Sequence, residues 1–270
     1  VYINGALTLN DLAFRTATSF LTVPSGVNID IGIAPGNSTS ANDTIVNIPR
    51  TFVQNERYVA IASGVLTPSS FATNPDAVST SFRLRFSANI RNAAQNAGEV
   101  DLKVFHGATD APTVDVLAQG AGILIDDAAY TDFAPYISVP AGDYLLDITP
   151  GSNNSVIVAT FSAELNGLAG GAAVVFASGF LDPSQNQNGA DFGLFAALPS
   201  GAVVTLNKVG NARLQVIHNA ADPAAASVDV YVNGALLLDN FNFREATPFI
   251  DVNSGQTLNI GIAGGNSTSA

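Results

Sequence analysis

Hydrophobic and polar residues alternate with a period of two through much of this chain. Residues 27–33 read VNIDIGI, residues 82–86 read FRLRF, and residues 258–262 read LNIGI. Successive side chains of a β-strand point to opposite faces of the sheet, so this alternation predicts strands with one face in a core and one in water. Pro, Gly and Asn clusters separate the runs, as they do at hairpin turns.

The central part of the chain is the easiest to divide into elements, and no segment of it has the 3.6-residue period of a helix. We expect nine strands there, near 101–106, 113–118, 122–125, 134–139, 143–149, 155–164, 172–180, 191–197 and 202–208. Seven to nine short strands in a unit of about 115 residues predict an all-β fold. The pattern is that of an antiparallel β-sandwich of immunoglobulin-like type.

The chain also repeats itself. Residues 1–41 and 230–270 align without a gap and are identical at 25 of 41 positions, at an offset of 229 residues. Residues 116–150 are a more diverged copy, and Ile61–Gly64 recurs as Phe176–Gly179 at an offset of 115. We therefore predict tandem sandwiches in a two-domain super-repeat of 229 residues.

Three units follow from this repeat. The first covers residues 1–99 and lacks its opening strand, the second covers 100–210 and is complete, and the third, 211–270, is the N-terminal half of a unit. Such a pattern is expected of a segment of a longer array, and arrays of this kind are commonly structural or adhesive. If both ends were natural termini, a strand from a neighbouring copy would complete the first unit.

Composition narrows the class of protein. Charged residues are 12% of the chain, hydrophobic residues are 47%, and the net charge is −12. There are two lysines, Lys103 and Lys208, and eight scattered arginines, so no basic surface suits nucleic acid or an anionic membrane. Cys, Met and Trp are absent, which excludes disulfides and suits a long-lived exposed material. We expect no membrane insertion, because the most apolar stretch, 167–181, is short and interrupted by glycines.

Two segments carry a recognisable motif. Residues 104–116 read VFHGATDAPTVDV and are followed by VPAG at 139–142, and residues 216–234 read VIHNAADPAAASVDVYVNG. These segments resemble a family of bacterial secreted domains catalogued as domain of unknown function 4397, and the resemblance covers essentially the whole chain. It implies a secreted, immunoglobulin-like module, often in tandem and on cell-surface proteins, and it implies no known chemistry.

The two histidines are the first candidates for chemistry. His106 and His218 are each followed by Asp four residues later and by a second Asp beyond: Asp110 and Asp115, or Asp222 and Asp229. A metal or acid–base site would need a third partner at a fixed position, and none recurs. We favour a structural reading, in which each His ends a strand and bonds the loop beneath it while Asp closes a turn.

Two further polar segments invite a metal reading. Residues 182–191, DPSQNQNGAD, resemble a calcium loop, but the closing Glu of an EF-hand is missing and the pattern does not recur in the first unit. We read this segment as a polar hairpin loop. Asp126 and Asp127 are adjacent carboxylates in a turn that need not converge on an ion.

Possible glycosylation sites are Asn37, Thr44, Asn153 and Asn266, of which Asn37 and Asn266 occupy the same repeat position. The sequence has no nucleophile elbow, no Cys and no phosphate-binding loop, so we predict no enzyme, no catalytic or metal residues and no cofactor.

We expect a structural segment of an extracellular bacterial filament or of a repetitive cell-surface adhesin. Its partners would be copies of itself arranged end to end, and surface glycans are a further candidate. Short linkers at 95–99 and 208–211 favour a stiff rod. The alternative is a carbohydrate-binding module that stacks sugars on Tyr2, Tyr130, Tyr136 and Tyr231. An enzyme, the third reading, would need His106 or His218 to line a pocket with a bound metal.

Overall fold

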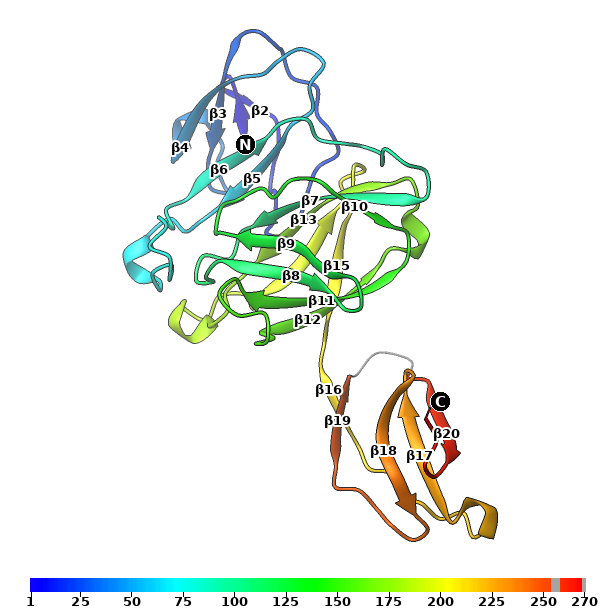
Figure 1. The fold of residues 1–270 in the computed structure, drawn as a ribbon. Coiled ribbons are helices and arrows are strands. Elements are labelled where there is room, and N and C mark those ends of the chain that lie inside the picture. The colour runs from blue at the N-terminus through cyan, green and yellow to red at the C-terminus, as the bar shows by residue number, and fades with distance from the viewer. Residues whose placement is uncertain (254–257, 269–270) are drawn as a thin grey trace. The chain divides into compact units, whose positions relative to one another are not determined.

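The fold was analysed in a computed structural model that describes residues 1–253 and 258–268. The chain forms two compact units, Val1–Lys208 and Val209–Ala270 (Figure 1). The described residues form β-strands and five short 3-10 helices, and they contain no α-helix. None of their helices is long and apolar enough to cross a membrane. The all-β prediction is confirmed.

All nine strands predicted for the central repeat are present. Their bounds are β7 (Glu99–His106), β8 (Val114–Ala118), β9 (Gly122–Ala128), β10 (Ile137–Pro140), β11 (Asp143–Pro150), β12 (Ala159–Glu164), β13 (Ala172–Ser178), β14 (Gly193–Ala197) and β15 (Val203–Val209). They pair in the order β10-β7-β13-β14-β15-β12-β11-β8-β9, and β9 and β10 are the end strands. This arrangement is consistent with an immunoglobulin-like sandwich.

The core of this repeat lies between the two halves of the strand order. Val100, Phe161 and Ala118, at 1% exposure each, come from β7, β12 and β8. One pairing is parallel: β7 lies beside β13 with Asp101 opposite Ala172 and His106 opposite Ala177. Period-two patterning marks strands but carries no information on their relative direction, so the sequence could not predict this pair.

The first repeat has two sheets in the same compact unit. Its strands are β1 (Tyr2–Ile3), β2 (Ala6–Leu7), β3 (Asn28–Ile33), β4 (Val46–Thr51), β5 (Val59–Ser63) and β6 (Arg83–Ser87). The orders are β2-β1-β3-β4 and β5-β6. Ile29 and Ile31 of β3 are buried under Tyr58, Leu84 and Phe86, as the alternation predicts.

The last 62 residues form the second compact unit. Its strands are β16 (Asn211–Leu214), β17 (Ser227–Val232), β18 (Ala235–Asn242), β19 (Ile250–Asn253) and β20 (Ile260–Gly264), in the orders β16-β19 and β18-β17-β20. Ile260 and Ile262 are 54% and 70% exposed, although Ile31 and Ile33 at the same repeat positions are covered in the first repeat. The alternation predicts a core face here, but the described residues of this unit leave more than half of each of these two side chains exposed.

The 3-10 helices lie in loops, at η1 (Ala41–Asp43), η2 (Pro68–Ser70), η3 (Asn166–Leu168), η4 (Pro183–Gln185) and η5 (Pro223–Ala225). A repeated Ser-Gly pair ends β5 and β13, where Gly64 and Gly179 have φ of +94° and +90°. A Cβ at Gly64 would lie 2.6 Å from the carbonyl oxygens of Thr80 and Ser81, so both the backbone angle and the space require glycine. This explains why Ala-Ser-Gly recurs at an offset of 115.

Candidate functional site

His106 is a buried side chain that supports the loop after β7. Its Nε2 lies 3.1 Å from the carbonyl oxygen of Pro112, which can only accept, so Nε2 carries the proton in the assigned tautomer. Nδ1 is then a lone-pair nitrogen, and it is buried with no hydrogen-bond partner among the described residues. Burial lowers the pKa of His106 against the weaker opposing effect of the Pro112 carbonyl, so the ring is neutral.

His218 occupies the equivalent place in the last unit. Its Nε2 lies 2.8 Å from the carbonyl oxygen of Ala225, and its Nδ1 accepts the backbone N–H of Ala220 at 3.3 Å. Asp222 accepts the N–H of Ala224 and thereby caps the 3-10 helix η5. Each histidine therefore bonds the loop beneath it, as the structural reading expects, and Asp222 closes a turn. His106 ends β7, but His218 lies four residues beyond the end of β16, so that part of the reading holds for the second repeat alone.

Asp110, four residues after His106, does not face the imidazole. Its two carboxylate oxygens accept the backbone N–H groups of Leu181 and Asp182 at 2.9 and 3.0 Å, and Oδ2 also accepts Nδ2 of Asn186 at 2.9 Å. Asp182 and Asn186 lie in the segment 182–191 that resembles a calcium loop, and Leu181 directly precedes it. The Asp110 carboxylate therefore anchors that loop, whereas His106 bonds a different segment.

Asp115 and Asp229 hold the strand that follows each of them. Asp115 is 1% exposed and accepts the N–H of Asp127 at 2.7 Å. Asp229 accepts the N–H of Asn240 at 2.7 Å and, through Oδ2, the N–H and hydroxyl of Ser267. The Asn240 N–H and then the Ser267 hydroxyl lower the pKa of Asp229. A charged carboxylate with these donors fixes the hairpin geometry.

The side chains of Asp115, Asp126 and Asp127 have ligand atoms within 4.8 Å of one another. Asp126 and Asp127 are exposed, and the oxygen of Asp115 is bonded to the Asp127 backbone. In the last unit Asn240 occupies the position of Asp127, opposite the same buried aspartate. The recurring element is thus the structural carboxylate, and the pair of exposed aspartates belongs to one repeat.

A network of buried polar side chains joins the first repeat to the second; we call it the joint. It comprises residues 67–78 of the first repeat and residues 107–113 and 180–191 of the second. Asn74, 4% exposed, donates to the carbonyl oxygens of Thr109 and Ala111, both at 2.9 Å. Asn186, fully buried, accepts the N–H of Ala72 at 3.0 Å. Each repeat therefore inserts one asparagine into the other's loop.

Further contacts surround the two asparagines. Asp76 accepts the backbone N–H and the hydroxyl of Thr113 at 2.6 and 2.9 Å. Phe71 stacks on Phe180 with ring centroids 5.7 Å apart. Because the asparagines are buried and their amide groups are satisfied from both repeats, separating the repeats would leave several polar groups without partners.

The linker at 95–99 is also tied to the second repeat. Asp101 is buried and accepts the side chains of Arg91 and Ser138 and the N–H of Gln95, at 2.6 to 3.0 Å. Burial alone would raise the pKa of Asp101, but Ser138, Arg91 and Gln95 together outweigh it and lower the pKa. Arg15, from the first repeat, donates to the carbonyl oxygens of Ser178 and Asp191. Sequence reasoning missed these contacts, because nothing in the pattern pairs residues 163 positions apart.

The candidate glycosylation residues differ in accessibility. Asn37, Asn153 and Asn266 are exposed in turns. Thr44 is half-buried, and its hydroxyl donates to the carbonyl oxygen of Ala41 at 2.6 Å. All four sites stay predictions, and Thr44 would have to break this bond to receive a sugar.

The tyrosines proposed for sugar stacking are mostly covered. Tyr2, Tyr130 and Tyr231 are 5% exposed or less, and Arg91 lies over the ring of Tyr136 at 4.2 Å. The hydroxyls of Tyr2 and Tyr231 bond Ser38 and Ser267, which occupy the same repeat position. These contacts leave little surface of the rings for a sugar to stack on.

Comparison with known proteins identifies the repeats. The family described as Domain of unknown function (DUF4397) matches residues 1–103 and again residues 101–187. The chain belongs to the DUF4397 family. No curated protein and no solved structure matches it. The two matches confirm tandem DUF4397 domains.

Proposed function

We propose that this chain is a non-enzymatic structural segment of an extracellular bacterial filament or repetitive cell-surface adhesin. The observation that carries the proposal is the joint. There the buried side chains of Asn74 and Asn186 each form hydrogen bonds with the backbone of the other repeat. An array that carries mechanical force needs neighbouring domains that keep a fixed position relative to each other. Reciprocal buried hydrogen bonds resist their separation, because water cannot reach these groups to replace the bonds.

The motif residues support the same proposal. His106, Asp110 and Asp115 each bond a different loop or strand, so they do not form one reactive centre. The sparse charge and the absence of Cys and Met suit a protein exposed outside the cell. Copies of the repeat, linked end to end, are the proposed partners.

The test is electron microscopy of the native material with gold-labelled antibodies raised against the second repeat. We expect gold at a regular axial spacing along extracellular filaments or surface fibres. Antibodies against an unrelated cytoplasmic protein of the same cells are the control. Label over dispersed particles or inside the cells would contradict the proposal.

The sugar-binding alternative can be examined on the same protein. A glycan array probed with the purified chain would show a specific oligosaccharide if that alternative holds. The burial of Tyr2, Tyr130 and Tyr231 gives us reason to expect no such signal.

A further inference from the structure

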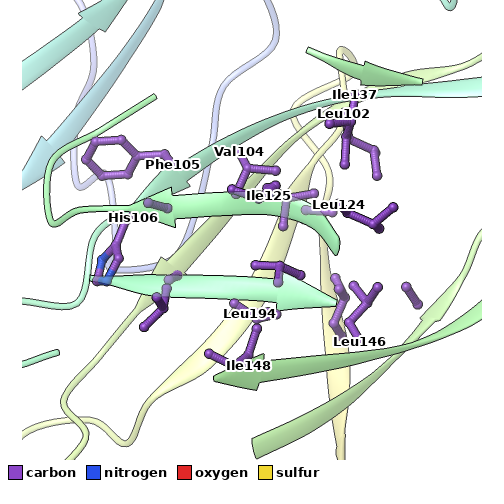
Figure 2. A pocket seen from close by; sticks show the side chains of 18 of the residues that line it. Leu102, Val104, Phe105, His106, Leu124, Ile125, Ile137, Leu146, Ile148 and Leu194 are labelled. Carbon is purple, nitrogen blue, oxygen red and sulfur yellow. The ribbon is translucent and has the colours of Figure 1, made fainter. Parts of the chain in front are cut away.

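The second repeat contains a cavity of about 100 Å³ between the two halves of its strand order (Figure 2). Apart from His106 and Tyr144, every side chain that lines it is apolar. A dry cavity lined by Leu, Ile and Val is a site for apolar molecules.

The cavity shares part of its wall with the surface at the seam between the end strands β9 and β10. A surface depression of about 360 Å³ lies there, lined by both strands and by the loop between them. Four residues line both the depression and the cavity: Leu124, Ile125, Ala128 and Ile137. Since β9 and β10 are not paired with each other, an apolar chain can pass between them without breaking a ladder hydrogen bond.

The seam is acidic. Asp126, Asp127 and Asp132 line the depression, all three are exposed, and neither Lys nor Arg lines it. A negatively charged head group at this place would meet like charges, and a positively charged one would meet opposite charges. The cavity selects for hydrocarbon, and the seam selects for a cation attached to it.

We propose that the second repeat binds an alkylammonium, with its hydrocarbon chain in the cavity between the sheets and its ammonium group at the seam among Asp126, Asp127 and Asp132. The size fits a short chain. A cavity of about 150 Å³ holds six-carbon benzene, so about 100 Å³ holds roughly four carbons, and the remaining carbons cross the seam. This binding is separate from the array function and stands or falls without it.

The probe is n-hexylammonium, with n-hexanoate as its oppositely charged counterpart. Methyl NMR of the full chain should show shifts at Ile125, Ile137, Leu146 and Leu194 on addition of n-hexylammonium, with Ile29 and Ile262 unchanged. Hexanoate should bind at least about tenfold more weakly. Absent shifts at the cavity methyls, or equal affinity for the two ions, would overturn the proposal.

Variants locate the two parts of the site. Ala196 of β14 lines the cavity, whereas its neighbour Ala197 does not. Ala196→Leu adds three carbons where about four fit and should weaken binding at least about tenfold, while Ala197→Leu should leave binding unchanged. If Ala196→Leu does not fold, Ala196→Val gives the same comparison. Unchanged affinity in the folded cavity variant contradicts the proposal.

The seam is tested with Asp126→Asn, because the Asp126 side chain makes no hydrogen bond within the described residues. Removing one of three carboxylates should weaken n-hexylammonium binding about threefold and strengthen hexanoate binding. Glu164→Gln, at an exposed carboxylate outside the seam that also makes no side-chain hydrogen bond within the described residues, is the matched control. An equal effect of the two substitutions would place the ammonium elsewhere.

Discussion

Replacing Asn186 by aspartate changes one atom at the centre of the joint. The amide nitrogen of Asn186 donates to Oδ2 of Asp110 at 2.9 Å and to the carbonyl oxygen of Asp182 at 2.8 Å. An ionised carboxylate of the same shape has no proton to donate. When ionised, the Asn186→Asp side chain therefore loses both bonds and places a second negative charge against Asp110 in a fully buried position, whereas its protonated form keeps one O–H to donate.

The structure sets the size of the effect. A hydrogen bond to a charged group contributes about 1.5–3 kcal/mol and one to a neutral carbonyl about 0.5–1.5 kcal/mol, so their loss alone costs about 2–4.5 kcal/mol. The new carboxyl lowers its charge repulsion with Asp110 by staying protonated, which raises its pKa in the folded state above the ordinary value near 3.9. We expect a total loss of about 3–5 kcal/mol at pH 7.

The sign of the pH dependence follows from that raised pKa. Between pH 4 and the folded-state pKa, the folded variant holds a proton that the unfolded variant has released. The stability deficit of the variant therefore grows as pH rises from 4 to 7, by up to about 1.4 kcal/mol per pH unit. Wild-type protein lacks this carboxyl and lacks this contribution to the slope.

The assay is urea unfolding followed by circular dichroism at pH 4 and pH 7 for both proteins. Asn188→Asp is the control, because Asn188 is exposed in the same loop with φ of 54°, which aspartate also tolerates. We expect the control to change stability by less than about 0.5 kcal/mol. A loss for Asn186→Asp below about 1 kcal/mol, or one independent of pH, would refute the reasoning that the joint depends on these two bonds.

Three other outcomes follow from the structure. Gly64→Ala and Gly179→Ala should each lower the free energy of unfolding in urea by about 2–4 kcal/mol, because a Cβ would meet carbonyl oxygens at φ near +90°. The control Gly5→Ala, with φ of +80° and open space around it, should lower it by about 1 kcal/mol. Burial lowers the folded-state pKa of His106, so below about pH 6.5 the unfolded state binds a proton that the folded state does not. The free energy of unfolding therefore falls as pH falls, and His106→Gln should remove up to about 1.4 kcal/mol per pH unit of that slope. Asp229→Asn should abolish hydrogen-exchange protection of the Asn240 and Ser267 amides, while protection in β12 stays unchanged, and retained protection would show that the carboxylate does not hold them.

Local patterns in the sequence were sufficient to predict the strands and the repeats. Alternation at 27–33 predicted β3 of the first repeat, and alternation together with the turn residues between runs predicted the strands of the second repeat. Both were possible because the side-chain period of two is a property of each strand alone. The roles of His106 and Asp222 were also within reach, since each bonds backbone within seven residues of itself. The Ala-Ser-Gly repeat was visible as a pattern, but its cause, the carbonyl oxygens of Thr80 and Ser81 beside Gly64, lies across the chain.

The sequence by itself determined the elements, the repeat length and the family, because those depend on local periodicity and on similarity between segments. Only the tertiary structure decided the parallel pairing of β7 with β13, the joint through Asn74 and Asn186, and the cavity behind Leu124 and Ile125. Each of these depends on which distant segments come together and on how completely their side chains fill the space between them. No local pattern encodes that, since the same alternating strand packs tightly in one sandwich and leaves room in another.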